Sequence, residues 1–132
     1  MAPWIRPLFG FAAAYDLILG LGFLVAGPAI FNAFNITPPN HWGYIYFSAG
    51  VVLIFGVAFA MVALDPRRYR DFIWLGVLFK LVYSGVSLGY FFFGDIPAPW
   101  VWFGWFDLVF AGLFVAAAAQ LRPSGSTLAA SA

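Results

Sequence analysis

Residues 44–64 read YIYFSAGVVLIFGVAFAMVAL, a run without a single charged side chain. A transmembrane helix needs about 20 predominantly apolar residues to cross the hydrocarbon core of a bilayer. Three more stretches of this kind lie at about residues 8–26, 72–93 and 100–121. The sequence therefore predicts an all-α integral membrane protein, a four-helix bundle formed by one domain over residues 1–121.

The composition places the chain in the same class. Of its 132 residues, 64% are hydrophobic, 22% aromatic and 8% charged, and the mean hydropathy is +0.96. Globular domains carry about 25% charged residues. The net charge of +1 is too small to predict a nucleic-acid partner. The absence of cysteine excludes disulfides and cysteine-ligated metal centres, and no motif of the sequence requires a cofactor.

Proline and glycine mark the ends of the predicted helices. Gly27-Pro28 follows the first stretch, Asp65-Pro66 follows the second, and residues 94–97 close the third. The connections between helices are short, so neighbouring helices should be antiparallel. Residues 122–132 are small and polar, and we expect them to form a flexible cytoplasmic tail.

The basic residues outside the helices predict the orientation of the bundle. The first and third connections contain no lysine or arginine. By the positive-inside rule, the side that carries the arginines faces the cytoplasm. We therefore expect both termini and the middle connection to be cytoplasmic. The arginines concerned precede the first helix, lie between the second and third, and follow the fourth: Arg6, Arg67, Arg68, Arg70 and Arg122.

A cleavable signal peptide is the alternative interpretation of residues 1–30. The apolar core of a signal peptide is typically about 7–15 residues and precedes a small-x-small cleavage site. The apolar stretch here is longer, contains Asp16, and ends in Gly27-Pro28. We therefore expect the first helix to be retained.

Three ionisable residues, Asp16, Lys80 and Asp107, lie inside these apolar stretches. A charge at the centre of a bilayer costs about 2.5–3.5 kcal/mol on insertion scales, so such residues face a bundle interior and find partners. At 1.5 Å of rise per residue, all three should lie within about 6 Å of one another in depth. We expect Lys80 to pair with one or both carboxylates, and one carboxyl group to carry a proton because an uncompensated buried carboxylate is costly.

Polar and small side chains recur on the predicted helices at spacings that suit interhelical contacts. The third helix carries polar residues three, four, seven and ten positions after the lysine, which is typical of one helical face: Tyr83, Ser84, Ser87 and Tyr90. Small-xxx-small pairs let helices approach closely in lipid. We expect both groups of residues to serve helix packing. The small-xxx-small glycines are Gly85, Gly89, Gly22, Gly56 and Gly112.

The run LILGLGFLVAG at residues 17–27 resembles the first helix of the DoxX-like group of small four-helix bacterial membrane proteins. The run AGVVLIFG at residues 49–56 resembles their second helix. The resemblance implies the bacterial cytoplasmic (inner) membrane and a link to membrane oxidoreductase assemblies, some of which are coupled to quinones. The acidic residue that the family places at the start of the second helix is missing here, so no residue role carries over.

Two classes of function follow from these patterns. The first is a non-enzymatic accessory or scaffold subunit that lies in the lipid bilayer and packs against other membrane proteins or further copies of itself. In that case the charged trio is a structural clamp that fixes helix register. The second is a small redox-linked (quinone) or proton or solute transport protein that uses Asp16, Lys80 and Asp107. We expect the first class, with the second as its alternative.

Overall fold

The computed structural model describes residues 2–121, which form four helices and no strand. Each helix is long and apolar enough to cross a membrane, which confirms the predicted all-α class. Arg122 and the predicted tail, residues 122–132, lie outside the described residues. The helices are α1 (Ile5–Ala33), α2 (Gly43–Leu64), α3 (Arg70–Phe93) and α4 (Ala98–Leu121).

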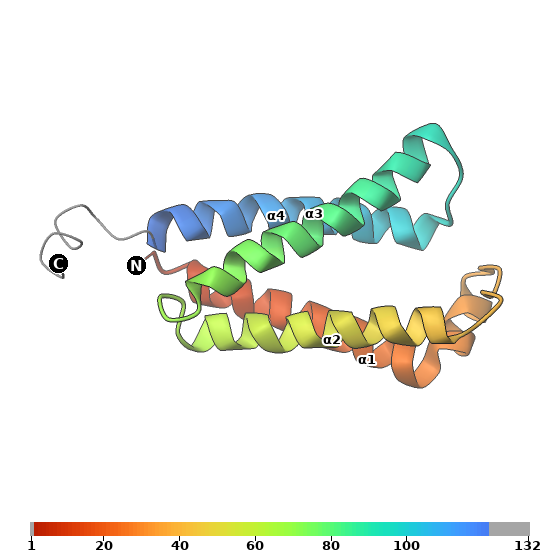
Figure 1. Cartoon of the computed structure of the whole chain (residues 1–132), viewed down its shortest axis with the longest axis horizontal. Helices are drawn as coiled ribbons and strands as arrows, with labels where there is room; N and C mark the ends of the chain where they lie inside the picture. Colours follow the sequence, from red (N-terminus) through yellow and green to blue (C-terminus); the bar gives the residue numbers. More distant parts are fainter. Residues whose placement is uncertain (1, 122–132) are drawn as a thin grey trace, which may run out of the picture.

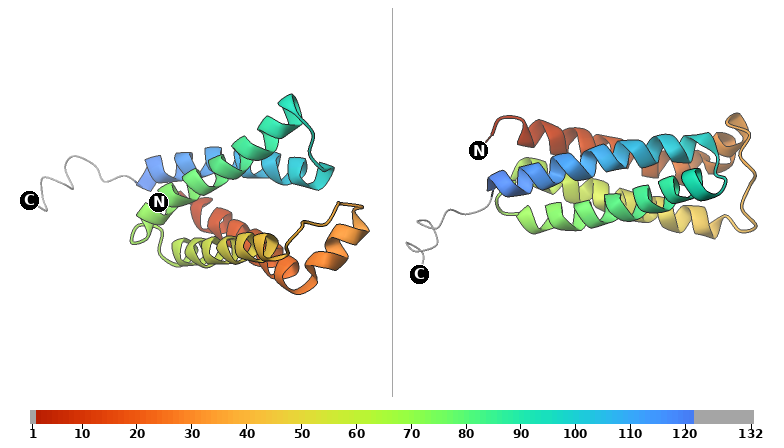
Figure 2. Two further views of the ribbon diagram at one scale, coloured as in Figure 1. Left: turned by 45° about the vertical axis from the view of Figure 1, so that its right-hand side comes forward. Right: turned by 90° about the horizontal axis from the view of Figure 1, so that it is seen from above.

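The four helices form two antiparallel hairpins (Figure 1). Helices α1 and α2 make the first hairpin, and α3 and α4 make the second. The hairpins lie close together at the end that holds the α2–α3 connection, and they diverge toward the opposite end (Figure 2). We call these the closed end and the open end. The start of α1 and the end of α4 both lie at the closed end (Figure 1).

A buried apolar cluster joins the two hairpins at the closed end. The stacked rings of Phe9 and Phe114 have centroids 4.6 Å apart, and the ring of Phe59 lies 5.0 Å from that of Phe114. Since lipid tails are as apolar as these side chains, close van der Waals packing rather than the hydrophobic effect stabilises the contact. The cluster is formed by Ile5, Phe9, Ala12, Ala13, Phe59, Val62, Ile73, Val77, Phe110, Phe114, Ala117, Ala118 and Leu121.

The predicted end of the first helix at Gly27-Pro28 is wrong. Helix α1 continues to Ala33, and a kink at Ala26, with φ −130° and ψ 26°, interrupts it. Proline lacks an N–H and its ring clashes with the carbonyl four residues earlier, so it breaks a helix that passes through it. The first turn of a new helical segment tolerates proline, because the N–H is not needed there. Gly27-Pro28 therefore bends α1 instead of ending it.

Arg70 joins the two helices of the second hairpin at the closed end, in addition to its predicted role in the membrane topology. Its Nε and Nη2 atoms donate hydrogen bonds of 3.1 and 2.9 Å to the backbone carbonyl of Ala118. The carbonyls of the last turn of a helix have no partner within that helix, and the helix dipole favours a cation there. The start of α3 thus caps the end of α4. Arg6, Arg67 and Arg68 are exposed at the same end of the bundle.

Within the first hairpin, glycines allow the helix backbones to approach closely. A Cβ atom at Gly56 would lie 3.0 Å from the backbone nitrogen of Leu17. A Cβ at Gly20, which the small-xxx-small pattern did not single out, would lie 2.8 Å from the carbonyl oxygen of Ala49. The prediction for Gly56 is thus confirmed, and Gly20 supplies the second close approach.

The other predicted packing glycines do not mediate contacts within the chain. Nothing lies within 4 Å of a Cβ built at Gly85, Gly89 or Gly112, and Gly22 meets only its own helix, at Ile30. The spacing of small residues identifies a smooth helix surface but not the direction in which it faces. These surfaces face away from the neighbouring helices.

Candidate functional site

The predicted charged trio assembles in the middle of the bundle. Lys80 Nζ donates hydrogen bonds to Asp16 Oδ1 at 2.9 Å, to Asp16 Oδ2 at 3.1 Å and to Asp107 Oδ1 at 2.9 Å. The three residues come from α3, α1 and α4, and their relative exposures are 0%, 1% and 5%. The lysine thus pairs with both carboxylates, so each of the two partners expected from the sequence is present.

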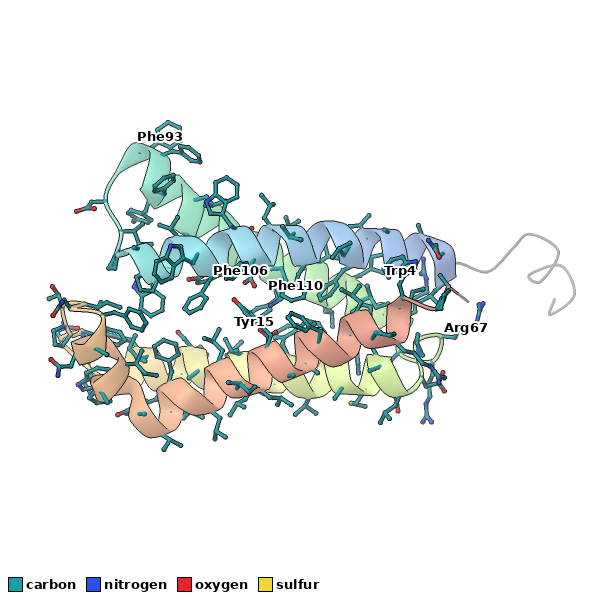
Figure 3. The ribbon with its side chains drawn as sticks, turned by 180° about the vertical axis from the view of Figure 1, so that it is seen from behind. Trp4, Tyr15, Arg67, Phe93, Phe106 and Phe110 are labelled. Atoms are coloured by element: carbon teal, nitrogen blue, oxygen red, sulfur yellow. The ribbon has the colours of Figure 1, made fainter. Side chains whose placement is uncertain are left out.

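Aromatic rings surround the lysine on its remaining sides. The rings of Tyr15, Phe59, Phe79 and Phe110 have centroids between 5.1 and 5.7 Å from Lys80 Nζ. At such distances a ring face attracts a cation, and the attraction is stronger when the site excludes water. Tyr15 and Phe110 lie between the hairpins, from α1 and α4 respectively (Figure 3).

Two tyrosine hydroxyls lie near the trio, and the sequence pattern predicts a hydrogen-bond partner for neither. The buried hydroxyl of Tyr15 has no hydrogen-bond partner among residues 2–121. Tyr83 donates a hydrogen bond of 3.1 Å to the carbonyl of Trp100. Tyr15 directly precedes Asp16 in the sequence, and that adjacency was the signal that could have brought it into the predicted site.

Asp107 keeps one carboxylate oxygen open. The three hydrogen bonds of Lys80 reach both oxygens of Asp16 but only Oδ1 of Asp107. No described residue donates a hydrogen bond to Asp107 Oδ2. The side chain of Asp107 is 8% exposed, against 2% for Asp16 and 1% for Lys80. The trio therefore presents one unused acceptor.

A half-open cavity of about 460 Å³ lies between the hairpins, on the open-end side of the trio. All four helices line it, and its wall is almost entirely apolar. Asp16 and Asp107 are the charged residues of its lining, while Ser48 and Tyr83 add hydroxyls. Its volume falls in the range of about 300–1,000 Å³ typical of small-molecule sites. Its aromatic residues are Phe23, Phe47, Phe79, Tyr83, Trp100 and Phe103.

The predicted polar stripe of α3 is divided between packing and the site. Ser87 and Tyr83 both donate hydrogen bonds to the carbonyl of Trp100 in α4, while Ser84 donates to Leu81 of its own helix. A Cβ at Gly104 would lie 2.6 Å from Ser87 Oγ, so glycine is needed where Ser87 meets α4. These contacts agree with the expected packing role.

Tyr90, the last residue of the predicted stripe, does not join these contacts, because it is 58% exposed. It lies in the last turn of α3, next to the α3–α4 connection at the open end, where the hairpins diverge (Figure 2). The spacing predicts the helical face of Tyr90 but not the divergence of the hairpins at that end.

A scan against protein-family models and searches of curated proteins and of solved structures find no match to this chain. The trio and the cavity beside it are therefore the features that bear on the function.

Proposed function

We propose that this protein is a membrane-embedded binding protein that holds an apolar small molecule in the cavity between its hairpins. The observation that supports this function is the cavity of about 460 Å³, lined by all four helices and bordered by two carboxylates. An apolar wall with a few convergent polar groups is the usual design of a small-molecule site. The binding function belongs to the second class expected from the sequence.

A structural clamp accounts for the hydrogen bonds of the trio but not for the cavity. Helices in lipid associate through close packing, and side chains that line a void lose their packing partners. A bundle selected for rigidity alone would fill the space between Asp16 and Phe23 on one hairpin and Tyr83 and Trp100 on the other. A bound molecule would restore those contacts.

The orientation of the site follows from the arginines at the closed end. If the closed end faces the cytoplasm, as the positive-inside rule indicates, the cavity lies in the outer half of the bilayer. We place the protein in the bacterial cytoplasmic membrane, in agreement with the DoxX-like resemblance of residues 17–27 and 49–56.

An accessory-subunit role is the second candidate, and the outward glycines of α3 favour it. Gly85 and Gly89 leave open space where a neighbouring helix could approach. Replacing both by leucine would block such a contact with another subunit or a second copy. This role predicts that native mass spectrometry in mild detergent detects a complex of the unmodified protein and that the double variant loses it.

The binding function is tested by filling the cavity. Val52 lines the cavity, whereas Ile54 on the same helix is 67% exposed to lipid. We expect an apolar molecule to copurify in mild detergent with the unmodified protein and with Ile54→Trp, and to be depleted from Val52→Trp. Extraction and mass spectrometry would measure it. Equal recovery from all three proteins, or recovery of bulk phospholipid alone, would contradict the proposal.

A further inference from the structure

We propose that the cavity selects lipophilic monocations, and that the cationic group binds against Asp107 Oδ2. This inference rests on the proposed binding function and adds the chemical class of the ligand. Three observations support it: the charge balance of the trio, the free acceptor on a residue that lines the cavity, and the aromatic lining of the cavity.

The trio is not electrically balanced. Two carboxylates and one ammonium sum to a charge of −1 when all three are ionised, and no other charged side chain lines the cavity among the described residues. A net charge is costly in a medium of low dielectric constant, where Coulomb interactions are strong. A ligand with a single positive charge would bring the local sum to zero.

The free acceptor belongs to a residue that lines the cavity. Asp107 is only 5% exposed, and it lines the cavity. Its Oδ2 atom receives no hydrogen bond from a described residue. The Lys80 ammonium donates hydrogen bonds to the two carboxylates, and Lys80 does not line the cavity. An anion entering the cavity would therefore meet carboxylate oxygens without a cationic donor, and we expect it to be excluded.

The lining suits a cation with an apolar body. Aromatic rings attract cations through their faces, and Phe79 already lies 5.5 Å from the Lys80 ammonium while it also lines the cavity. Phe103 and Trp100 line the same cavity from α4, in the hairpin that also contains Phe79. Aliphatic side chains such as Val52 and Val86 complete the wall and would contact the apolar body of the ligand.

Charge balance also predicts that binding of a cation releases one proton from the trio. Without a ligand, neutrality of the trio requires one carboxyl group to hold a proton, because an uncompensated buried carboxylate is costly. When a monocation binds, it takes the place of that positive charge and the proton leaves to solvent. Binding thus exchanges one cation for one proton, with no bond formed to the ligand.

The test compares a cationic and a neutral probe of similar aromatic bulk, tetraphenylphosphonium and triphenylmethanol, on the full chain in detergent. We expect tetraphenylphosphonium to bind the unmodified protein and to bind Asp107→Asn more weakly by about tenfold or more, which is about 1.4 kcal/mol. Triphenylmethanol should bind both proteins equally, because an amide still accepts a hydrogen bond. Asp95→Asn makes the same chemical change at an exposed site outside the cavity and should leave both affinities unaltered.

Proton release gives a second measurement on the unmodified protein, so the test stands even if Asp107→Asn fails to fold. In weak buffer with a pH indicator, tetraphenylphosphonium should release protons in proportion to its binding, and triphenylmethanol should release none. Equal binding of both probes, independent of Asp107 and without proton release, would overturn the selection for cations but leave the binding function intact. If neither probe binds, the selection is overturned, and the Val52→Trp comparison decides the binding function separately.

Discussion

Lys80 Nζ lies 2.9 Å from Asp16 Oδ1, although the two residues are 64 positions apart in the chain. Among residues 2–121 this is the ion pair that links the second hairpin to the first, since Asp107 belongs to the same hairpin as Lys80. The Asp16 carboxylate therefore links the two hairpins, whereas the Asp107 carboxylate links the two helices of the second hairpin, although both bind the same ammonium.

Removal of the lysine should strongly destabilise the protein. Lys80→Met leaves two buried carboxylates without a cation, and breaking a buried ion pair from one side costs about 3–5 kcal/mol. The triple variant Lys80→Met, Asp16→Asn, Asp107→Asn removes all three charges and should recover most of the loss. The free energy of unfolding in mixed micelles, followed by circular dichroism, measures both. A triple variant no more stable than Lys80→Met would show that the charges are not the cause.

Asp16→Asn should loosen the hairpins more than Asp107→Asn does. The first substitution weakens the ion pair between hairpins, whereas the second weakens one within a hairpin. The chain has no cysteine, so spin labels can be attached to single cysteines introduced at Thr37 and Ala98, which are both exposed. Distances between the labels should lengthen and broaden in Asp16→Asn. Identical distributions in the two variants would contradict the assignment of the bridge.

Gly20→Ala should destabilise the first hairpin, because the new methyl group would lie 2.8 Å from the backbone oxygen of Ala49. Overpacking of this kind typically costs about 1–3 kcal/mol. Gly85→Ala is the matched control, since its Cβ meets nothing within 4 Å. Thermal unfolding of the two variants measures the difference. Equal loss in both would mean that the helix contact does not depend on Gly20.

Arg70→Gln should free the last turn of α4. It shortens the side chain that donates two hydrogen bonds to Ala118, and hydrogen bonds of charged groups contribute about 1.5–3 kcal/mol. Hydrogen–deuterium exchange should become faster in the amides near Ala118 and stay unchanged elsewhere. Arg67→Gln removes an exposed arginine of the preceding connection and should have no such effect.

The orientation of the bundle can be tested by labelling single cysteines in intact cells. Cysteines at Thr37 and Ala98, near the open end, should react with a membrane-impermeant reagent. A cysteine at the exposed Asp65, in the α2–α3 connection, should react only after the cells are lysed. The reverse pattern would place the closed end outside.

The helices and the charged trio were predictable because both follow from the cost of polar groups in lipid. A run such as residues 44–64 has few alternatives to a spanning helix. Asp16, Lys80 and Asp107 had to find one another because nothing else in the apolar segments can neutralise them. Neither argument depends on the angle between the two hairpins.

The cavity and the packing faces depend on the angle between the two hairpins, and the sequence does not specify this angle. Gly20 and Gly85 both lie inside apolar helices, yet a Cβ at Gly20 would meet a backbone and one at Gly85 would meet nothing. The aromatic residues of the cavity are hidden among many others that face lipid. Pro28 predicts a disruption of the first helix, but whether a proline ends or bends a helix depends on what the chain packs against beyond it.

The division of the trio between hairpins has a consequence for how the chain enters the membrane. The second hairpin contains both Lys80 and Asp107, so it can insert with its charges already paired. The first hairpin has no basic residue at the depth of Asp16, and that carboxyl group enters at least cost when it is protonated. Each half of the protein can thus cross into lipid as a neutral unit, and the assembled trio stays neutral as long as one carboxyl group keeps that proton.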